Sequence, residues 1–353
     1  MIDNITYFKV GFNFTEELLN EIILINSNNY CISEVYGSTK ELSYLTARPE
    51  YRLPEITREK FLFFVDKLNT NNISFNYVLN SNDIGSKQKI IDRIPEIKRY
   101  ISFLIESGVT RFTVSLPIMA EIIRSVNSNV FIEISTIARI ESISQIAIWK
   151  ELYNINRVCV HLSKNRNIQF LMNANKFCKE NNIELCLMVN EFCGNGLNCN
   201  GYITGPCIFR DHCYSLHSKG YDENDSSKLN GYPLSKCILM RASKINWIKL
   251  NFIRPEDLFM YENIGINLFK ITGRTASTEY IIRIIHAYIN RSYDWNLLSL
   301  WFDVNKNNNV YISNKKLNGF IKYWFINRDH RCSEQICGVT CNYCNNYYEK
   351  NLE

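Results

Sequence analysis

The chain alternates short apolar runs with stretches of helical periodicity, and this alternation restricts its fold more than any other feature. Between residues 7 and 189, seven apolar runs end in turn residues and are separated by amphipathic stretches. Such alternation predicts parallel strands joined by crossover helices. The expected strands are residues 7–12, 31–36, 73–79, 110–115, 130–135, 157–161 and 183–189, and the expected helices are 15–25, 57–68, 87–107, 118–125, 140–152 and 168–180.

Seven such units favour an α/β fold of the (β/α)8 TIM-barrel type over a doubly wound sheet, which is the alternative. The eighth strand has two candidates, residues 247–253 and 266–272. We prefer the second because residues 275–290 after it have a clear helical pattern, and because Pro255 is suited to start a short helix over 254–261. We therefore expect a barrel domain over residues 1–291 and a small extension with a Cys-rich tail over residues 292–353.

Composition narrows the classes of function. The 353 residues can bury a large core, and no stretch approaches the roughly 18 uncharged apolar residues of a membrane span. The net charge of +5 is small and its basic residues are scattered, so charge does not argue for nucleic-acid binding and leaves it open. The N-terminus lacks a signal-peptide pattern, and we expect a cytoplasmic protein without membrane attachment.

Cysteine is over-represented. The chain has 13 cysteines, an odd number, and without a secretion signal such clusters bind metal or do redox work more often than they form disulfides. Cys159, Cys178 and Cys186 lie in apolar patterns and are expected to be buried. The remaining clustered thiols form a loop group after residues 183–189 (Cys193, Cys199, Cys207, Cys213 and later Cys237) and a tail group (Cys332, Cys337, Cys341 and Cys344).

Both groups suit a metal, since thiolates are soft ligands for zinc and for iron–sulfur clusters. The loop group lacks the CxxC pairs usual in zinc ribbons, which favours an iron–sulfur cluster there. The tail spacing, CxxxxCxxxCxxC, fits a second cluster or a zinc ion about equally, and the alternative is four surface thiols without a metal.

Polar residues stand where the expected strands end, so in a barrel they would converge on one mouth. Lys270 and Arg274 are candidate catalytic residues that would hold an anionic substrate, and Glu191 is a candidate acid or base. A structural ion pair is the alternative for each. The expected substrate-binding residues are Asn76, Asn80, Glu133, His161 and Asn190.

Several motifs resemble the collagenase-like peptidase family U-32. A Lys-Ile-x-Gly-Arg block covers residues 270–274, and the sequences FNYVLN and VNEFC cover residues 75–80 and 189–193. Cys-x-x-Arg at residues 207–210 and Asn165-Arg166 also match, so the resemblance covers most of residues 5–292. Further matches are Pro255, Asp257, Leu258, Gly265, Ile266, Phe269, Tyr280 and Tyr288.

The resemblance implies a barrel-like catalytic domain and, as in several family members, a 4Fe-4S cluster. The family spacing implies Cys193, Cys207 and Cys237 as ligands, with Cys213 or Cys199 as the fourth, because the loop over residues 194–206 is longer than in the family. The family includes oxygen-independent hydroxylases and proteins described as collagen-degrading peptidases.

Three hypotheses follow. The first is an iron–sulfur tailoring enzyme, an oxygen-independent hydroxylase acting on a small molecule, peptide or RNA base, with a partner subunit of the same family as a further expectation. The second is a collagenase-like peptidase, although the sequence has no HExxH or GxSxG motif and offers only a Cys213–His217 pair. The third is a non-catalytic binding protein with structural zinc sites.

Overall fold

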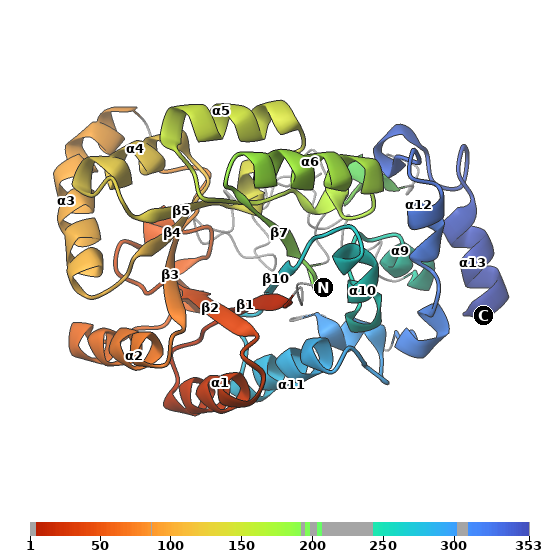
Figure 1. Cartoon of the computed structure of the whole chain (residues 1–353), viewed down its shortest axis with the longest axis horizontal. Helices are drawn as coiled ribbons and strands as arrows, with labels where there is room; N and C mark the ends of the chain where they lie inside the picture. The colour runs from red at the N-terminus through yellow and green to blue at the C-terminus, as the bar shows by residue number, and fades with distance from the viewer. Residues whose placement is uncertain are drawn as a thin grey trace, which may run out of the picture.

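Eight parallel strands close into a barrel in the computed structural model of the chain (Figure 1). The structure describes residues 5–85, 87–191, 195–197, 203–206, 243–301 and 310–352. Neighbouring strands run in the order β1-β10-β7-β6-β5-β4-β3-β2, as a (β/α)8 barrel requires, so the predicted fold is confirmed. The strands are β1 (Tyr7–Gly11), β2 (Ile32–Gly37), β3 (Ser74–Leu79), β4 (Arg111–Val114), β5 (Phe131–Ile134), β6 (Arg157–Cys159), β7 (Glu184–Met188) and β10 (Leu268–Ile271).

Helices surround this barrel and cover its outer face (Figure 1). Several begin at a side chain that accepts a backbone N–H, as at Thr15 and Thr57. Helix α5 begins three residues later than predicted because Ser142 and Gln145 form a capping box there. The helices are α1 (Glu16–Asn29), α2 (Arg58–Thr70), α3 (Lys87–Glu106), α4 (Pro117–Val126), α5 (Ile143–Tyr153), α6 (Ile168–Glu180) and α11 (Thr278–Ile289).

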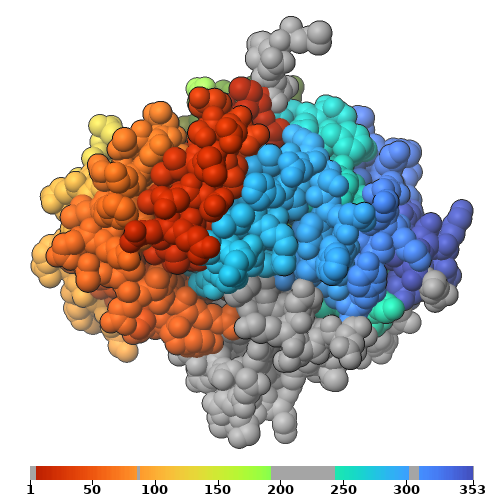
Figure 2. Space-filling model, turned by 90° about the horizontal axis from the view of Figure 1, so that it is seen from below, coloured from red at the N-terminus to blue at the C-terminus, as the bar shows by residue number. Residues whose placement is uncertain are grey.

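The preferred eighth strand is confirmed, because β10 pairs with β1 on one side and β7 on the other. The other candidate, residues 247–253, instead begins within the short helix α9 (Lys244–Ile248). The expected short helix is present as η5 (Pro255–Asp257) followed by α10 (Leu258–Glu262). Seen from below, the α11 segment lies against the α1 segment, which closes the ring of helices (Figure 2).

Short 3-10 helices shape the loops at the C-terminal ends of the strands, and one hairpin follows β7. The 3-10 helices are η1 (Ser43–Leu45), η2 (Glu50–Arg52), η3 (Thr136–Ala138) and η4 (Leu162–Lys164). The hairpin pairs β8 (Asn195–Leu197) with β9 (Ile203–Pro206) in antiparallel fashion. The alternating pattern does not predict this hairpin, because its strands are short and rich in glycine and polar residues.

The C-terminal extension packs onto one side of the barrel (Figure 1). Trp301, Phe320 and Trp324 are almost fully buried and belong to the same apolar core as the barrel. Within the described residues, no helix is both long and apolar enough to cross a membrane. The extension comprises η6 (Leu297–Leu300), η7 (Asn314–Leu317), α12 (Lys322–Ile326), η8 (Cys332–Glu334) and α13 (Tyr343–Asn351).

Candidate active site

The interior of the barrel is charged, where barrels of this type are usually filled with branched apolar side chains. Lys9 on β1 contacts Glu34 at 2.8 Å and Glu133 at 2.6 Å, and Arg157 on β6 contacts both carboxylates at 2.9 Å. All four side chains are almost fully buried. Burial alone would raise the pKa of each glutamate, but the charges of Lys9 and Arg157 lower it. The carboxylates are therefore ionised at neutral pH.

This network changes the role expected for two residues. The sequence predicts Asn76 and Glu133 at the mouth, but both lie within strands and face the barrel interior. Asn76 Oδ1 accepts a hydrogen bond from Thr113 at 2.6 Å, and Glu133 is held by the network. Their alternating strand positions point inward below the mouth, so they support the floor of the site.

A pocket opens above this floor, at the C-terminal ends of the strands, where barrel enzymes carry their chemistry. Its volume of about 50 Å³ has room for a small polar group or a few water molecules. Lys270, Arg274, Asn80 and Glu191, four of the residues predicted from strand ends, line it. The other lining residues are Tyr36, Ala47, Arg48, Val78, Ser135, Thr136, Ile137, Met188, Thr272 and Gly273.

Arg274 is a buried cation held by hydroxyl groups. Its guanidinium donates to Ser38 Oγ at 2.7 Å and to Thr46 Oγ1 at 3.5 Å. Burial, together with the nearby charge of Arg48, lowers the pKa of Arg274 to about 10. Two guanidinium groups that repel each other at the rim of one pocket favour an anion between them.

Lys270 lies at the floor of the same pocket and is less closely compensated than Lys9 and Arg157, the other two fully buried cations of the barrel network. Its ammonium is 3.9 Å from Glu133 Oε1 and 4.3 Å from the centre of the Tyr36 ring. Lys9, its neighbour in the register, has two carboxylates at much shorter distances. Among the described residues this network has four cations, Lys9, Lys270, Arg111 and Arg157, and three carboxylates, Glu34, Glu133 and Glu184, so one positive charge is left over.

The end of β7 positions Glu191 at the rim. The side-chain amide of Asn190 accepts from Thr272 N at 2.6 Å and donates to Leu300 O at 3.0 Å, so its bonds go to the backbone. Asn190 thus ties the ends of β7 and β10 together and fixes where Glu191 enters the pocket. Asn80 connects two mouth loops in the same way, accepting from Ala47 N and donating to Ser135 Oγ.

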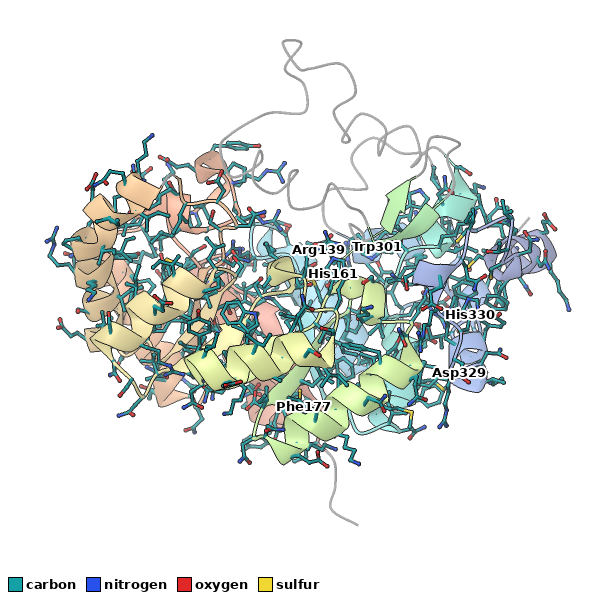
Figure 3. The ribbon with its side chains drawn as sticks, turned by 90° about the horizontal axis from the view of Figure 1, so that it is seen from above. Arg139, His161, Phe177, Trp301, Asp329 and His330 are labelled. Atoms are coloured by element: carbon teal, nitrogen blue, oxygen red, sulfur yellow. The ribbon has the colours of Figure 1, made fainter. Side chains whose placement is uncertain are left out.

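His161 is fully buried just after β6, where it is the N-cap of η4 (Figure 3). Its Nδ1 is 3.0 Å from Glu141 Oε1 and 2.8 Å from Ser163 Oγ. Burial alone would raise the pKa of Glu141, but the hydrogen bond and charge of His161, with the charge of Arg139, lower it to about 2. His161 is absent from the residues that line the described pocket.

The cysteines fall into three groups. Cys193, Cys199, Cys207, Cys213 and Cys237, the proposed loop ligands, lie outside the described residues. The predicted burial of Cys159, Cys178 and Cys186 is confirmed. The tail cysteines Cys332, Cys337, Cys341 and Cys344 are partly buried free thiols. No three His, Cys, Asp or Glu side chains of the described part of the chain are arranged to hold a metal ion.

Three residues important to this site are not predicted by the sequence pattern. Arg48 lies in an irregular loop after β2, where periodicity carries no signal. Tyr36 and Lys9 lie within apolar strands, whose pattern does not single them out. A lysine that alternates with apolar residues in the sequence YFKVG is nevertheless a sign of an interior charge.

The motif residues divide between the pocket and the scaffold. Lys270, Gly273 and Arg274 line the pocket. Asp257 instead receives two hydrogen bonds from Arg254, at 2.8 and 2.7 Å, and Tyr288 donates to Ile253 O at 2.8 Å. Only the first set is placed to meet a ligand.

Comparison with known proteins gives one curated relative and one solved structure that bear on the family. The chain is 30% identical over 289 residues to "Uncharacterized protease MJ1657" of Methanocaldococcus jannaschii, covering 80% of this chain and 78% of the relative. The solved structure of the U32 peptidase Mk0906 superposes with a TM-score of 0.51 at 12% identity, over 76% of this chain and 92% of that one. No protein-family model matches the chain.

Proposed function

The chain belongs to the U32 peptidase family, and from this premise we propose that it is an iron–sulfur enzyme that modifies an anionic substrate without molecular oxygen. The reaction that we propose is hydroxylation of a small molecule, a peptide or an RNA base. A C–H bond is replaced by a C–OH bond, water supplies the oxygen atom, and the two electrons and two protons released pass to an external electron acceptor. The observation that carries this proposal is the pocket at the barrel mouth, where Lys270, Arg274 and Arg48 meet at the root of the cysteine-bearing loop.

The cluster ligands in this proposal are Cys193, Cys207 and Cys237, with Cys213 or Cys199 as the fourth. Their chemistry fits, because soft thiolates on a Gly-rich loop are the donors that iron–sulfur clusters use. The loop leaves the barrel directly after Glu191, a residue of the pocket. When bound there, the cluster would supply electron transfer, and it would activate a substrate oxygen only if one iron lacks a thiolate ligand.

The protein's own side chains have separate roles. Arg274 and Arg48 would hold a carboxylate or phosphate of the substrate at the rim, since guanidinium offers two parallel donors to such a group. The Lys270 ammonium would hold a second oxygen atom at the floor. Glu191 is partly exposed, so it can exchange protons with solvent, and it would act as acid or base toward the bound substrate.

A peptidase is the second candidate, because the relative of Methanocaldococcus jannaschii is named a protease. Ser163, His161 and Glu141 cluster, but their geometry argues against a catalytic triad. Ser163 Oγ and Glu141 Oε1 both approach Nδ1 of His161, whereas a triad places the nucleophile at Nε2 and the acid at Nδ1. The Ser163 backbone N–H also points at Nδ1, at 3.4 Å, as a cap of η4.

A third candidate is a binding protein whose metal sites only stabilise the fold, with or without a partner subunit of the same family. It differs from the first two in having no turnover. A buried ammonium that is loosely compensated, as at Lys270, favours a ligand-binding site but does not distinguish binding from catalysis.

The test compares cells that lack the protein with cells that express the wild type or a Cys193→Ala variant, all grown without oxygen. Mass spectrometry of small-molecule, peptide and RNA fractions should find a species that carries one additional oxygen atom and requires both the protein and Cys193. A metal-free protein that cleaves casein or gelatin would support the peptidase instead.

A further inference from the structure

The C-terminal tail brings its four cysteines together on one side of the barrel, apart from the mouth. Cys337 and Cys341 are joined by a β-bridge around a tight turn in which Gly338 has a φ of 87° and donates to Cys341 O at 2.9 Å. Cys332 lies in η8, and Cys344 lies in the first turn of α13. Trp324 connects these two elements, because its indole N–H donates to Cys332 Sγ and its ring centre lies 5.3 Å from that of Tyr343, the residue before Cys344.

Two polar groups already face these sulfur atoms. The indole N–H of Trp324 donates to Cys332 Sγ at 3.2 Å, and His330 Nε2 is 3.8 Å from Cys341 Sγ. An N–H that points at sulfur, as that of Trp324 does, is common around metal-bound thiolates, because it stabilises negative charge on the sulfur. Figure 3 shows His330 on the extension, well separated from His161 after β6.

The independent observation is a buried cation without a counter-ion. Arg166 is 2% exposed, and its guanidinium lies over the rings of Trp324, Phe320 and Phe252 at 4.5, 5.1 and 5.4 Å. It donates to Ile248 O at 3.0 Å, while its Nε has no hydrogen-bond partner among the described residues. Within the same part of the chain, no carboxylate forms an ion pair with Arg166. Burial raises the pKa of Asp257, and Arg166 is near enough for its charge to oppose this rise, but the ion pair of Asp257 is with Arg254.

A buried guanidinium is costly unless an opposite charge compensates it. Neutral thiols would not compensate Arg166, but four thiolates around a divalent ion or a cluster of charge +2 carry a net charge of about −2. Arg166 lies beside this group of cysteines, because its guanidinium is 4.5 Å from the ring centre of Trp324, whose N–H donates to Cys332 Sγ.

We propose that Cys332, Cys337, Cys341 and Cys344 hold a tetrathiolate metal centre whose negative charge is neutralised by the buried Arg166. The backbone already gathers the four residues, and side-chain rotation would bring the sulfur atoms into coordinating positions around the metal. The centre would be structural, because η8 and α13 have no fully buried residue and metal binding would add folding free energy to their partial packing on the core. Zinc and an iron–sulfur cluster share this chemistry.

The backbone of β9 lies against η8, so the centre would also fix the hairpin at the start of the loop group. This proposal does not depend on the chemistry at the barrel mouth.

The test uses the full chain purified without oxygen and compares the wild type with a Cys337→Ser/Cys344→Ser variant. The matched control is Cys31→Ala/Cys178→Ala, which removes two buried thiols elsewhere. Loss of one zinc per chain, or of one cluster's iron and sulfide, from the tail variant alone supports the proposal and identifies the metal. Unchanged zinc, iron and sulfide in the tail variant would overturn it.

A second variant leaves all four thiols in place, so that metal loss cannot be attributed to misfolding of a cysteine variant. Arg166→Met fits the aromatic surroundings but removes the charge, and we expect the tail metal to be lost to a chelator about 10–100-fold more readily, the usual effect of removing a group that supports the metal ligands. Arg166→Lys should restore most of the retention. Equal metal retention in the Met variant and the wild type would rule out the counter-ion role of Arg166.

Discussion

Lys9 and Lys270 occupy the same level of adjacent strands, yet their surroundings give them different roles. They are partners in the β1–β10 register, and both ammonium groups face the ring of Tyr36. Lys9 has two carboxylates within 2.8 Å, whereas Lys270 has one at 3.9 Å. The first therefore stabilises the barrel, and the second is available to a ligand.

Replacing Lys9 with Met should lower the free energy of unfolding by about 3–5 kcal/mol, because Glu34 and Glu133 would remain buried with Arg157 as their main partner. Lys40→Met is the matched control, since it breaks an ion pair of similar length, 2.6 Å to Glu55, on the exposed surface. That change should have little effect. Urea unfolding of both variants measures the difference, and equal effects would contradict the structural role of Lys9.

Anion binding at the mouth is testable without the natural substrate. Inorganic phosphate should raise the melting temperature of the wild type, and a ligand at one hundred times its Kd stabilises by about 2.7 kcal/mol. Arg48→Gln/Arg274→Gln should abolish this shift, whereas Arg58→Gln, which removes an exposed arginine, should preserve it. A phosphate shift that survives loss of both pocket arginines would place the anion elsewhere.

The Glu141–His161 pair predicts a pH dependence. The pKa of Glu141 in the folded protein is about 2, below the value of about 4.3 for an unfolded chain. A lowered pKa gives stability that is complete above about pH 4.3 and is lost as the pH falls toward 2. The wild type should therefore lose more stability over this range than Glu141→Gln, with Glu180→Gln as a surface control. Parallel pH profiles of melting temperature would contradict the pairing.

Residues at strand ends could be predicted because an apolar run that stops at a polar residue marks the mouth directly. Lys270, Arg274, Asn80 and Glu191 are predicted in this way and do line the pocket. The depth of Glu133 could not be predicted, because an interior position differs from a mouth position by only two residues along a strand. Arg48 reaches the pocket through loop conformation, which leaves no periodic pattern in the sequence.

At the scale of elements, the barrel strands could be predicted closely because their apolar runs are buried on both faces. The β8–β9 hairpin could not, because it is too short and too polar to show a period of two. The composition predicts an extension from residue 292, and the structure shows how closely it packs against the barrel. Trp301 stacks on Trp247 at 5.3 Å, and Leu300 O accepts from Asn190 and Tyr280.

Two truncations should therefore behave differently. Removing residues 331–353 should eliminate the tail metal and leave the barrel folded, because η8 and α13 have no fully buried residue. Removing residues 292–353 should expose Trp247 and strongly destabilise the barrel. Thermal unfolding followed by circular dichroism compares the two, and a wild-type melting temperature for the longer deletion would contradict the close packing of the extension on the barrel.

At the scale of the whole molecule, one hairpin connects the sequence of the loop group with the structure of the tail. Its strands lie in the sequence between Cys193 and Cys207, and β9 lies against η8 of the tail. In the proposed division, the mouth carries chemistry on an anionic substrate and the tail centre gives structural support.

The most direct test of the proposed iron–sulfur chemistry is the iron and acid-labile sulfide content per chain after purification without oxygen. We expect iron and sulfide in the wild type, with the broad visible absorbance of an iron–sulfur protein. Cys193→Ala should lack the iron and sulfide of one cluster, while the buried control Cys31→Ala should keep the wild-type content of both. A wild type without iron, or a Cys193→Ala variant with unchanged iron and sulfide, would contradict the claim.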